Sequence, residues 1–396
     1  IVAADDVTIR RNTLGFAVLG QEGTSAERIT FTDNIVRSTA NKLVAIRGSG
    51  LTPCPASQHV ISNNTFISDH VCTPGVDCDE PMILFVWCVS HSTFSHNTMT
   101  AASKSQGIRL RDESDNNSFT NNTVWVHDPD GSFGALNITS GNAGKHHPRL
   151  NTFSNNLFRS DTDLALNMQS PGDGNAFDHN VFWSNTDGIA NMMNDGSNNN
   201  SWDHNTFFNA GSAPALLFDY RNNRPTDNFT NNIIATSGAT AVQVTSGVGW
   251  DFSRYAGNYN LFWSTNAAAT FLPYGTLASW NNSGSPDDDN SLYGNPHFTN
   301  AAAGLFTIQS ISPALSAGSN GSNIGALGVD TGPVNCSESW SCGEWSACLN
   351  GIQTRTCLDA NICGTTASRP AITQSCAEPI GPDATSPNPI ANLLAS

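Results

Sequence analysis

Apolar and polar residues follow a short phrase that returns along most of the chain: apolar, any, any, Asn, any, apolar. Phe119–Val124 and Phe177–Phe182 are two copies of it. Successive copies lie 22 to 34 residues apart, within the range of repeat lengths typical of solenoid proteins. The asparagines of the ten copies are Asn12, Asn34, Asn64, Asn97, Asn122, Asn156, Asn180, Asn205, Asn232 and Asn260.

The composition of each repeat predicts β-strands rather than helices. Thr, Val, Ile and Phe dominate the repeats and alternate with a period of two. One unit of this size cannot bury its own apolar face, whereas stacked units cover one another. The pattern therefore predicts an all-β fold, a parallel β-helix of about ten coils over residues 1–332, with the asparagines in a hydrogen-bonded ladder at one corner.

The repeated phrase resembles the repeats of the right-handed parallel β-helix superfamily, which includes the pectate lyases. The resemblance covers about residues 1–330, and residues 295–326 are similar to the closing segment of many secreted members. It implies a right-handed solenoid. It does not select one function, because the same scaffold carries lyases, hydrolases, epimerases, adhesins and structural proteins.

A different composition follows the repeats. Residues 333–378 hold six cysteines, a Trp-Ser-Cys motif and a Trp-Ser-x-Cys motif, a combination that resembles a thrombospondin type 1 repeat. The resemblance implies a stack of Trp340, Trp345 and Arg355 side chains in a disulfide-held adhesion or spacer module. A stalk that binds no ligand is the alternative. Residues 379–396 are rich in proline and are interpreted as a linker or tail.

The net charge of −16 argues against nucleic acid and anionic membranes as partners. No apolar run has the length of a membrane span, so no membrane insertion is expected. The cysteines form two dense clusters of even number, which favours disulfides over zinc sites and predicts a secreted or cell-surface location. The predicted disulfide cysteines, with pairing left open, are Cys54, Cys72, Cys78, Cys88, Cys336, Cys342, Cys348, Cys357, Cys363 and Cys376.

Both ends of the sequence carry expectations. The chain opens almost directly inside a repeat, so Ile1 is interpreted as a processed or truncated start. The proline-rich tail suggests a further domain or a surface anchor after Ser396. A first coil without a cap would expose strand edges, so end-to-end stacking on another copy of the protein is also predicted.

The second strand-forming stretch of each repeat predicts two outward columns of side chains. Cationic and aromatic residues occupy these columns on three successive coils. Aromatic faces stack on sugars, and arginines pair with uronate carboxylates. The expected partner is therefore an extracellular polysaccharide or glycoprotein. Solvated arginines without a ligand are the alternative. One column contains Ala45, Phe85, Arg109, Asn137 and Asn167, and the other contains Arg47, Trp87, Arg111, Thr139 and Gln169. The predicted carbohydrate-binding residues are Arg47, Trp87, Arg109, Arg111, Asn137, Asn167 and Gln169.

The stretch from Lys104 to Arg111 is loosely similar to the catalytic strand of alginate and chondroitin lyases, although its Gly-Ile-x-Leu core is also the generic pattern of a coil. The resemblance implies that Arg109 or Arg111 removes the proton next to a uronate carboxylate, helped by Lys104, often with calcium neutralising the carboxylate. Asn185–Ile189 matches the first motif of the polygalacturonase family, which implies a catalytic Asp187. The other motifs of that family do not follow.

Two Asp-His pairs, Asp178-His179 and Asp203-His204, occupy the same place in consecutive repeats. Stacked about 4.8 Å apart, they are candidate metal ligands, with solvated corner residues as the alternative. The acidic segment Asp287–Asn290 offers oxygen ligands for Ca2+, but its spacing is irregular and a solvated loop is the simpler interpretation. No cofactor is certain from the sequence, and Ca2+ is the candidate.

Three functions stay open at the level of sequence. The first is a secreted or cell-surface protein that engages polysaccharide, as an adhesin or an extracellular matrix component. The second is a polysaccharide lyase or a related uronate-active enzyme. The third is a self-assembling surface-layer or filament subunit. The thrombospondin-like module and the trailing linker favour the first.

Overall fold

The computed structural model describes residues 4–20, 26–40, 42–48, 54, 57–70, 81–101, 105–127, 134–139, 146–162, 164–168, 172–185, 190–194, 199–220, 227–244, 255–283, 288–329, 339–348, 351–359 and 368–376. The chain forms two compact units, Ile1–Asp330 and Thr331–Ser396. Within the described ranges, no helix is both long enough and apolar enough to cross a membrane.

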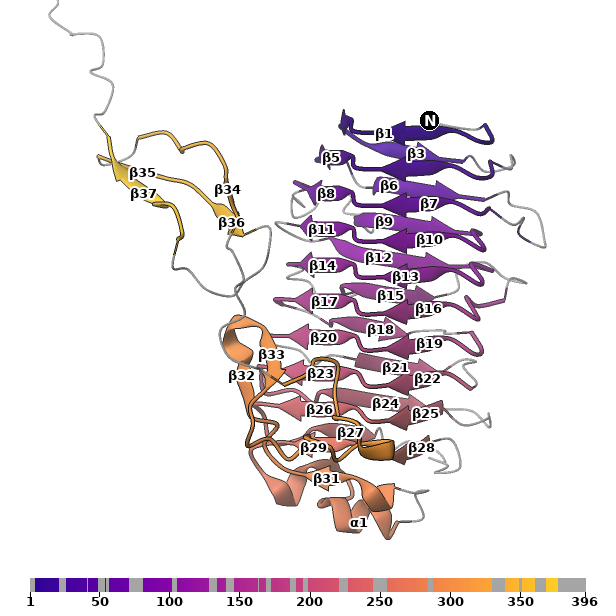
Figure 1. The fold of residues 1–396 in the computed structure, drawn as a ribbon, viewed down its shortest axis with the longest axis vertical. Coiled ribbons are helices and arrows are strands. Elements are labelled where there is room, and N and C mark those ends of the chain that lie inside the picture. The colour runs from indigo at the N-terminus through magenta and orange to yellow at the C-terminus, as the bar shows by residue number, and fades with distance from the viewer. Residues whose placement is uncertain are drawn as a thin grey trace, which may run out of the picture. The chain divides into compact units, whose positions relative to one another are not determined.

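The first unit is an all-β parallel solenoid, as the sequence predicts, with three sheets running along the stack (Figure 1). The first sheet contains β1 (Thr8–Arg10), β4 (Thr30–Thr32), β7 (Val60–Ser62), β10 (Thr93–Ser95), β13 (Ser118–Thr120), β16 (Thr152–Ser154), β19 (Ala176–Asp178), β22 (Ser201–Asp203), β25 (Asp227–Thr230) and β28 (Tyr255–Asn258).

The second sheet follows the first within each turn of the chain. It contains β2 (Thr13–Leu14), β5 (Ile35–Ser38), β8 (Thr65–Ser68), β11 (Thr98–Ala101), β14 (Thr123–Val126), β17 (Leu157–Ser160), β20 (Val181–Ser184), β23 (Thr206–Asn209), β26 (Ile233–Thr236), β29 (Leu261–Trp263) and β31 (Leu292–Tyr293).

The third sheet carries the predicted carbohydrate-binding columns. It contains β3 (Ala17–Leu19), β6 (Lys42–Arg47), β9 (Met82–Trp87), β12 (Gln106–Arg111), β15 (Leu136–Thr139), β18 (Leu166–Met168), β21 (Ala190–Asn194), β24 (Leu216–Tyr220), β27 (Val242–Val244) and β30 (Phe271–Leu272).

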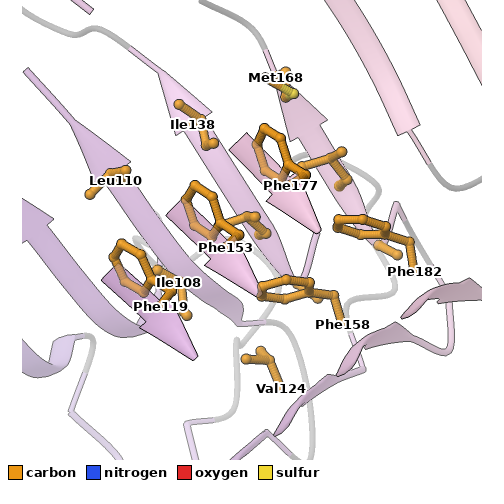
Figure 2. Close-up of a cluster of buried hydrophobic side chains, with 14 of the residues drawn as sticks. Ile108, Leu110, Phe119, Val124, Ile138, Phe153, Phe158, Met168, Phe177 and Phe182 are labelled. Atoms are coloured by element: carbon orange, nitrogen blue, oxygen red, sulfur yellow. The ribbon is translucent and has the colours of Figure 1, made fainter. Parts of the chain in front are cut away.

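Stacked aromatic rings form the centre of the core. Phe119 pairs in register with Phe153, and Phe153 pairs with Phe177. Their rings are nearly parallel, with centroids 4.8 Å and 4.7 Å apart (Figure 2). Trp202 continues the stack on Phe177 at 3.8 Å. The spacing of neighbouring strands, about 4.8 Å, is close to that of stacked rings, so a flat side chain fits this repeated inward position.

The repeated asparagines form the predicted ladder. In a typical rung, Asn122 donates its backbone N–H and its Nδ2 to Asn156 Oδ1, both at 2.9 Å, and Nδ2 also donates to the Phe94 carbonyl at 2.9 Å. The ladder side chains from Asn34 to Asn260 are at most 2 % exposed. Each amide therefore satisfies buried backbone groups at the corner between the first and second sheets.

Asp288 and Ser291 terminate this ladder. Asn260 donates its backbone N–H to Ser291 Oγ at 2.9 Å and its Nδ2 to Asp288 Oδ1 at 3.2 Å. Trp280 Nε1 donates to the second Asp288 oxygen at 2.9 Å, and burial raises the pKa of this carboxyl. The expectation of a solvated loop is wrong at Asp288, because the carboxylate is buried and engaged by the end of the ladder.

A second ladder lies five residues before the first in each turn, and the sequence analysis missed it. Asn117 donates its backbone N–H and Nδ2 to Asn151 Oδ1, and Asn151 does the same to Asn175. The file continues through Asn200 to Asp227. Because Ser92 and His59 replace asparagine in the earlier turns, the residue type does not repeat along the whole chain.

The residue before each ladder asparagine has a left-handed backbone. At these ten corner positions φ lies between 51° and 58°. Asn, Asp and His tolerate this conformation better than most residues, and eight of the ten are Asn, Asp or His. The file contains Arg11, Asp33, Asn63, His96, Asn121, Asn155, His179, His204, Asn231 and Tyr259.

The C-terminal part of the first unit folds back over the solenoid. The antiparallel strands β32 (Phe298–Asn300) and β33 (Leu305–Ile308) belong to a segment that packs on the outer face of the second sheet, where Phe306 meets Trp183 edge-on at 5.5 Å. The helix α1 (Leu277–Asn281) lies at the end of the stack and places the fully buried Trp280 on Phe271. The short 3-10 turns are η2 (Ala267–Ala269), η3 (Asp288–Asn290), η4 (Ala301–Ala303) and η5 (Ser319–Gly321).

The second unit contains two antiparallel strand pairs, β34 (Trp340–Cys342) with β36 (Cys357–Asp359), and β35 (Ile352–Thr354) with β37 (Thr373–Ser375). Arg355 stacks on Trp345 at 4.3 Å, and Arg369 lies 5.6 Å from the Trp340 ring. The predicted disulfides are confirmed for Cys342–Cys357 and Cys348–Cys376 here and for Cys54–Cys88 in the solenoid. The other predicted disulfide cysteines, Cys72, Cys78, Cys336 and Cys363, lie outside the described residues.

Candidate functional site

The register of the third sheet brings together most of the residues that the sequence aligned. Arg111 pairs with Trp87 of the preceding strand, and Trp87 pairs with Arg47 of the strand before that. Arg109 lies between Phe85 and Asn137 in the other column, which continues to Asn167. The alternation of β-strand side chains explains why both columns point away from the aromatic core. Lys104, Gln169 and Asp187 lie outside the described residues.

The two columns differ in burial. Arg109 is 7 % exposed, and Asn137 and Asn167 are 0 % and 2 % exposed. A side chain that is this inaccessible cannot lie directly against a polysaccharide. Arg47, Trp87 and Arg111 are half-buried instead, and they form the accessible part of the predicted surface. We call these three residues the Arg–Trp patch.

The arginines of the Arg–Trp patch lie close to the rings of Trp87 and of the buried Phe85. The Arg111 guanidinium lies 5.7 Å from the Trp87 ring centroid and 6.0 Å from that of Phe85. Arg47 lies 5.8 Å from the Phe85 centroid. These distances are at the outer limit of cation–π attraction, so the contacts orient the arginines without engaging their hydrogen-bond donors. An arginine in this state keeps its planar fork for an anionic partner.

Acidic residues at the end of β12 orient one side of the Arg111 fork. Asp112 Oδ2 lies 3.2 Å from Arg111 Nε, and its side chain is completely buried. Asp112 and Glu113 both have a left-handed backbone, with φ of 40° and 47°. Two consecutive residues of this kind store backbone strain, which is common near functional sites. The signal that sequence reasoning missed is the acidic run directly after Arg111.

A third acidic residue of the same turn, Asp115, is contacted by Arg149 and His146. It accepts hydrogen bonds from the Arg149 backbone at 3.0 Å and from Arg149 Nε at 3.2 Å, and His146 Nε2 lies 3.5 Å away. Burial nevertheless raises the pKa of Asp115, and the bonds from Arg149 oppose that shift. The turn after β12 therefore carries buried carboxyl groups, of which Asp112 contacts the Arg–Trp patch.

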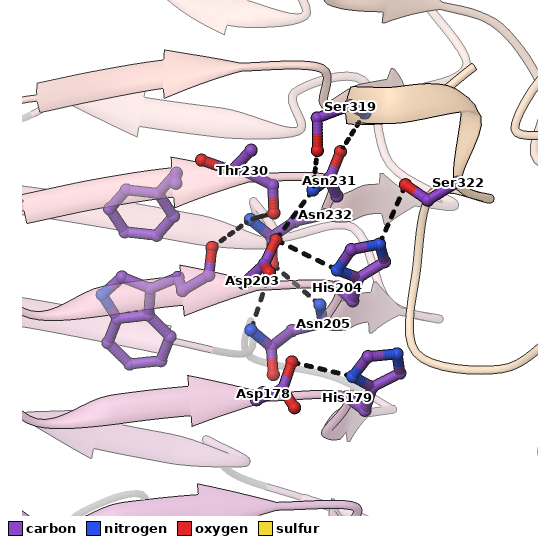
Figure 3. A network of polar contacts seen from close by, with 12 residues as sticks. Asp178, His179, Asp203, His204, Asn205, Thr230, Asn231, Asn232, Ser319 and Ser322 are labelled. Atoms are coloured by element: carbon purple, nitrogen blue, oxygen red, sulfur yellow. Dashed lines mark hydrogen bonds and ion pairs between the residues drawn. The ribbon is translucent and has the colours of Figure 1, made fainter. Parts of the chain in front are cut away.

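The two Asp-His pairs lie at the ends of the adjacent strands β19 and β22, at the corner after the first sheet (Figure 3). His179 Nδ1 lies 2.7 Å from Asp178 Oδ1, and His204 Nδ1 lies 3.0 Å from Asp203 Oδ1. The two imidazole rings are parallel within 4°, with centroids 4.8 Å apart. The prediction that stacking brings both pairs together is confirmed by this geometry.

Residues of the returning C-terminal segment complete the surroundings of the second pair. His204 Nε2 lies 3.1 Å from Ser322 Oγ, and Asn231 Nδ2 donates to Asp203 Oδ1 at 2.8 Å. Burial raises the pKa of Asp203, but the adjacent His204 imidazole and the hydrogen bond from Asn231 outweigh burial, and the pKa lies below its usual value. Asp203 is therefore an anion at neutral pH.

Sequence reasoning also missed a Trp-Arg-Trp sandwich on the second sheet. The Arg159 guanidinium lies 4.0 Å from the ring centroids of both Trp125 and Trp183. Asp161 accepts from Arg159 Nε and from Trp125 Nε1, each at 2.8 Å. Each member of the sandwich stands three residues after a ladder asparagine, so an alignment on those asparagines contains the signal.

The parallel solenoid does not by itself indicate what the protein binds or converts, since one scaffold serves many activities. Function must be inferred from the Arg–Trp patch, the acidic turn beside it and the Asp-His pairs. Comparison adds no family to this description, as no family model matches the chain and no curated protein matches it either.

Proposed function

We propose that this protein is an extracellular polysaccharide-binding solenoid that holds acidic glycans at the Arg–Trp patch. The observation that carries the proposal is the stacking of Arg47, Trp87 and Arg111 at one position of consecutive strands. The protein has a net charge of −16, so a partly exposed cationic and aromatic surface stands out from its surroundings. Such a protein would act as an adhesin or as a matrix component.

The chemistry of the patch fits a uronate-containing polymer. The planar guanidinium of Arg111 pairs with a carboxylate through two parallel hydrogen bonds, and the Trp87 indole offers an apolar face to a sugar ring. Asp112 contacts Arg111 through Nε, and the two terminal nitrogens of the fork take no part in this contact. Because neighbouring strands lie about 4.8 Å apart, consecutive coils present these groups at short, regular intervals along a chain-like ligand.

The proposal includes two finer relationships that rest on sequence resemblance. The first is membership of the right-handed, pectate-lyase-like β-helix superfamily. The second is a thrombospondin type 1-like module in the second unit, supported by the disulfides Cys342–Cys357 and Cys348–Cys376 and by the Arg355–Trp345 stack. Disulfides are stable in oxidising compartments, which supports a location outside the cytoplasm.

A uronate lyase is the second candidate, and the strained acidic turn at Asp112 and Glu113 favours it. In this alternative Arg111 is a better candidate base than Arg109, because Arg109 is only 7 % exposed. A filament subunit is less compatible with the described residues. Continuous head-to-tail stacking would require displacement of α1 and of Trp280, which cover one end of the core.

A glycan array read together with ultraviolet absorbance separates these functions. The wild-type protein should retain uronate-containing glycans, and Trp87→Ala should retain less because the ring loses its sugar contact. A binding protein leaves alginate, pectate and chondroitin sulfate unchanged, whereas a lyase generates an unsaturated, absorbing product. Product formation that is lost in Arg111→Gln would replace the binding proposal by the lyase. Failure of the wild-type protein to retain any acidic glycan would refute both.

A further inference from the structure

We propose that Asp178, His179 and His204 form a binding site for a divalent transition-metal ion of the zinc class, separate from the Arg–Trp patch. One ligand atom from each of these residues lies within 4.8 Å of the other two. Two imidazole nitrogens and one carboxylate oxygen are the donor types found in zinc sites, while Ca2+ and Mg2+ favour oxygen donors alone.

The backbone fixes the positions of both histidines. His179 and His204 have φ of 54° and 51° and directly follow the adjacent strands β19 and β22. Their rings are parallel within 4°, so their nitrogen atoms face the same surroundings on consecutive coils. The fold itself does not require imidazole here, because Asn121 and Asn155 fill the same left-handed position in earlier turns.

His204 Nδ1 supplies an independent observation. This atom is buried and makes no hydrogen bond of acceptable geometry in the described part of the chain, although Asp203 Oδ1 lies 3.0 Å away. The other ring nitrogen, Nε2, lies 3.1 Å from Ser322 Oγ (Figure 3). When Nε2 donates its hydrogen to Ser322, Nδ1 presents a lone pair toward the carboxylate. A cation bound at Nδ1 uses this lone pair, and the Asp203 carboxylate beside it favours the positive charge.

Metal binding requires a modest closure of the three side chains. Zinc bonds of about 2.0–2.2 Å place ligand atoms roughly 3–3.5 Å apart, whereas the present ligand atoms are spread over separations of up to 4.8 Å. The side chains of Asp178 and His179 are 49 % and 40 % exposed, so they are free to rotate toward His204. Asp203 remains beside His204 as a further anion that favours a cation.

The experiment is isothermal titration of chelator-treated protein with ZnCl2 near neutral pH. The wild-type protein should bind one Zn2+ at this site, and His179→Asn should weaken that binding at least tenfold. Asparagine suits the left-handed corner, so this variant should fold normally, which circular dichroism checks. The matched control is His96→Asn, in the same file but next to Ser95 rather than an aspartate, and its affinity should stay within about twofold of wild type.

Two further measurements keep the outcome decisive. Asp178→Asn should also weaken Zn2+ binding, and Co2+ should give the visible absorption of a site with nitrogen ligands in the wild type but not in His179→Asn. Equal affinities for wild type, His179→Asn and His96→Asn would overturn the proposal. Absence of Zn2+ binding by the wild type would likewise leave the Asp-His pairs as structural contacts alone.

Discussion

Asn260 donates its side-chain amide to the buried carboxylate of Asp288, and this contact ends a ladder that begins at Asn12. In such a ladder each asparagine donates hydrogen bonds to the asparagine of the next coil. The last asparagine has no such neighbour, so its donors need a different acceptor. Asp288 fills that role and also accepts from Ser291 Oγ at 2.7 Å and from Trp280 Nε1 at 2.9 Å. The carboxylate thereby ties the end of the ladder to α1.

Replacing Asp288 should therefore destabilise the solenoid. Asp288→Ala leaves the buried donors of Asn260, Trp280 and Ser291 without their acceptor, and each unsatisfied buried group costs about 1–3 kcal/mol. We expect the free energy of unfolding to fall by roughly 3 kcal/mol, measured from urea transitions. Asp289→Ala, at an exposed position of the same turn, is the matched control and should change stability by less than about 0.5 kcal/mol. Equal effects of the two substitutions would show that Asp288 does not stabilise the end of the ladder.

A substitution in the middle of the ladder should be more damaging than one beside it. Asn156→Ala removes the acceptor of the Asn122 backbone and side chain, and the donor to the Phe119 carbonyl. We expect a loss of about 3 kcal/mol or more in urea unfolding. Asn155→Gly tests the neighbouring exposed corner, where glycine suits the left-handed backbone, and should cost no more than about 0.5 kcal/mol. A small effect of Asn156→Ala would mean that solvent replaces the rung.

His59 should make stability depend on pH. It is buried, accepts the Ile29 N–H through Nδ1 at 3.2 Å, and has its pKa lowered by burial to about 4. An unfolded histidine protonates near 6.5, so the stabilisation by neutral His59 is fully present above about pH 6.5 and is lost as the pH falls toward about 4. The upper limit of that loss is on the order of 3 kcal/mol.

The matched variant for this prediction is His59→Asn, because asparagine occupies the same rung at Asn117 and Asn151. Its unfolding free energy should vary less between pH 6.5 and pH 4.5 than that of the wild type. The measurement is the difference between the two proteins at each pH, which cancels the contribution of the carboxylates. Parallel pH profiles would show that His59 is not the titrating group.

The sequence predicted the solenoid and the first ladder because the residue type itself repeats there. Asn122, Asn156 and Asn180 recur with the same apolar neighbours, so position and chemistry could both be inferred. The second ladder was missed because Ser92 and His59 perform the role that asparagine performs at Asn151. Several side-chain types can supply a hydrogen-bond acceptor. A structural role can therefore repeat along the chain although the residue type does not, and sequence periodicity then fails to show it.

The columns of the third sheet show a different limit. Alternation in β-strands correctly predicted that Arg109 and Arg111 point to the same side as Phe85 and Trp87. It did not predict that Arg109 is buried while Arg111 stays accessible, because periodicity gives the direction of a side chain but not what covers it. The acidic turn at Asp112 was missed for a related reason, since its burial depends on contacts between distant segments.

Calorimetric titration with pectate and alginate oligosaccharides tests the Arg–Trp patch most directly. Arg111→Gln should weaken the affinity of whichever oligosaccharide the wild type binds by at least tenfold, because glutamine cannot form the bidentate pair with a carboxylate. Arg37→Gln is the control, since Arg37 is an exposed arginine of the second sheet that pairs with Asp69. It should bind like the wild type. Equal weakening by both substitutions, or no binding by the wild-type protein, would contradict the assignment of this surface.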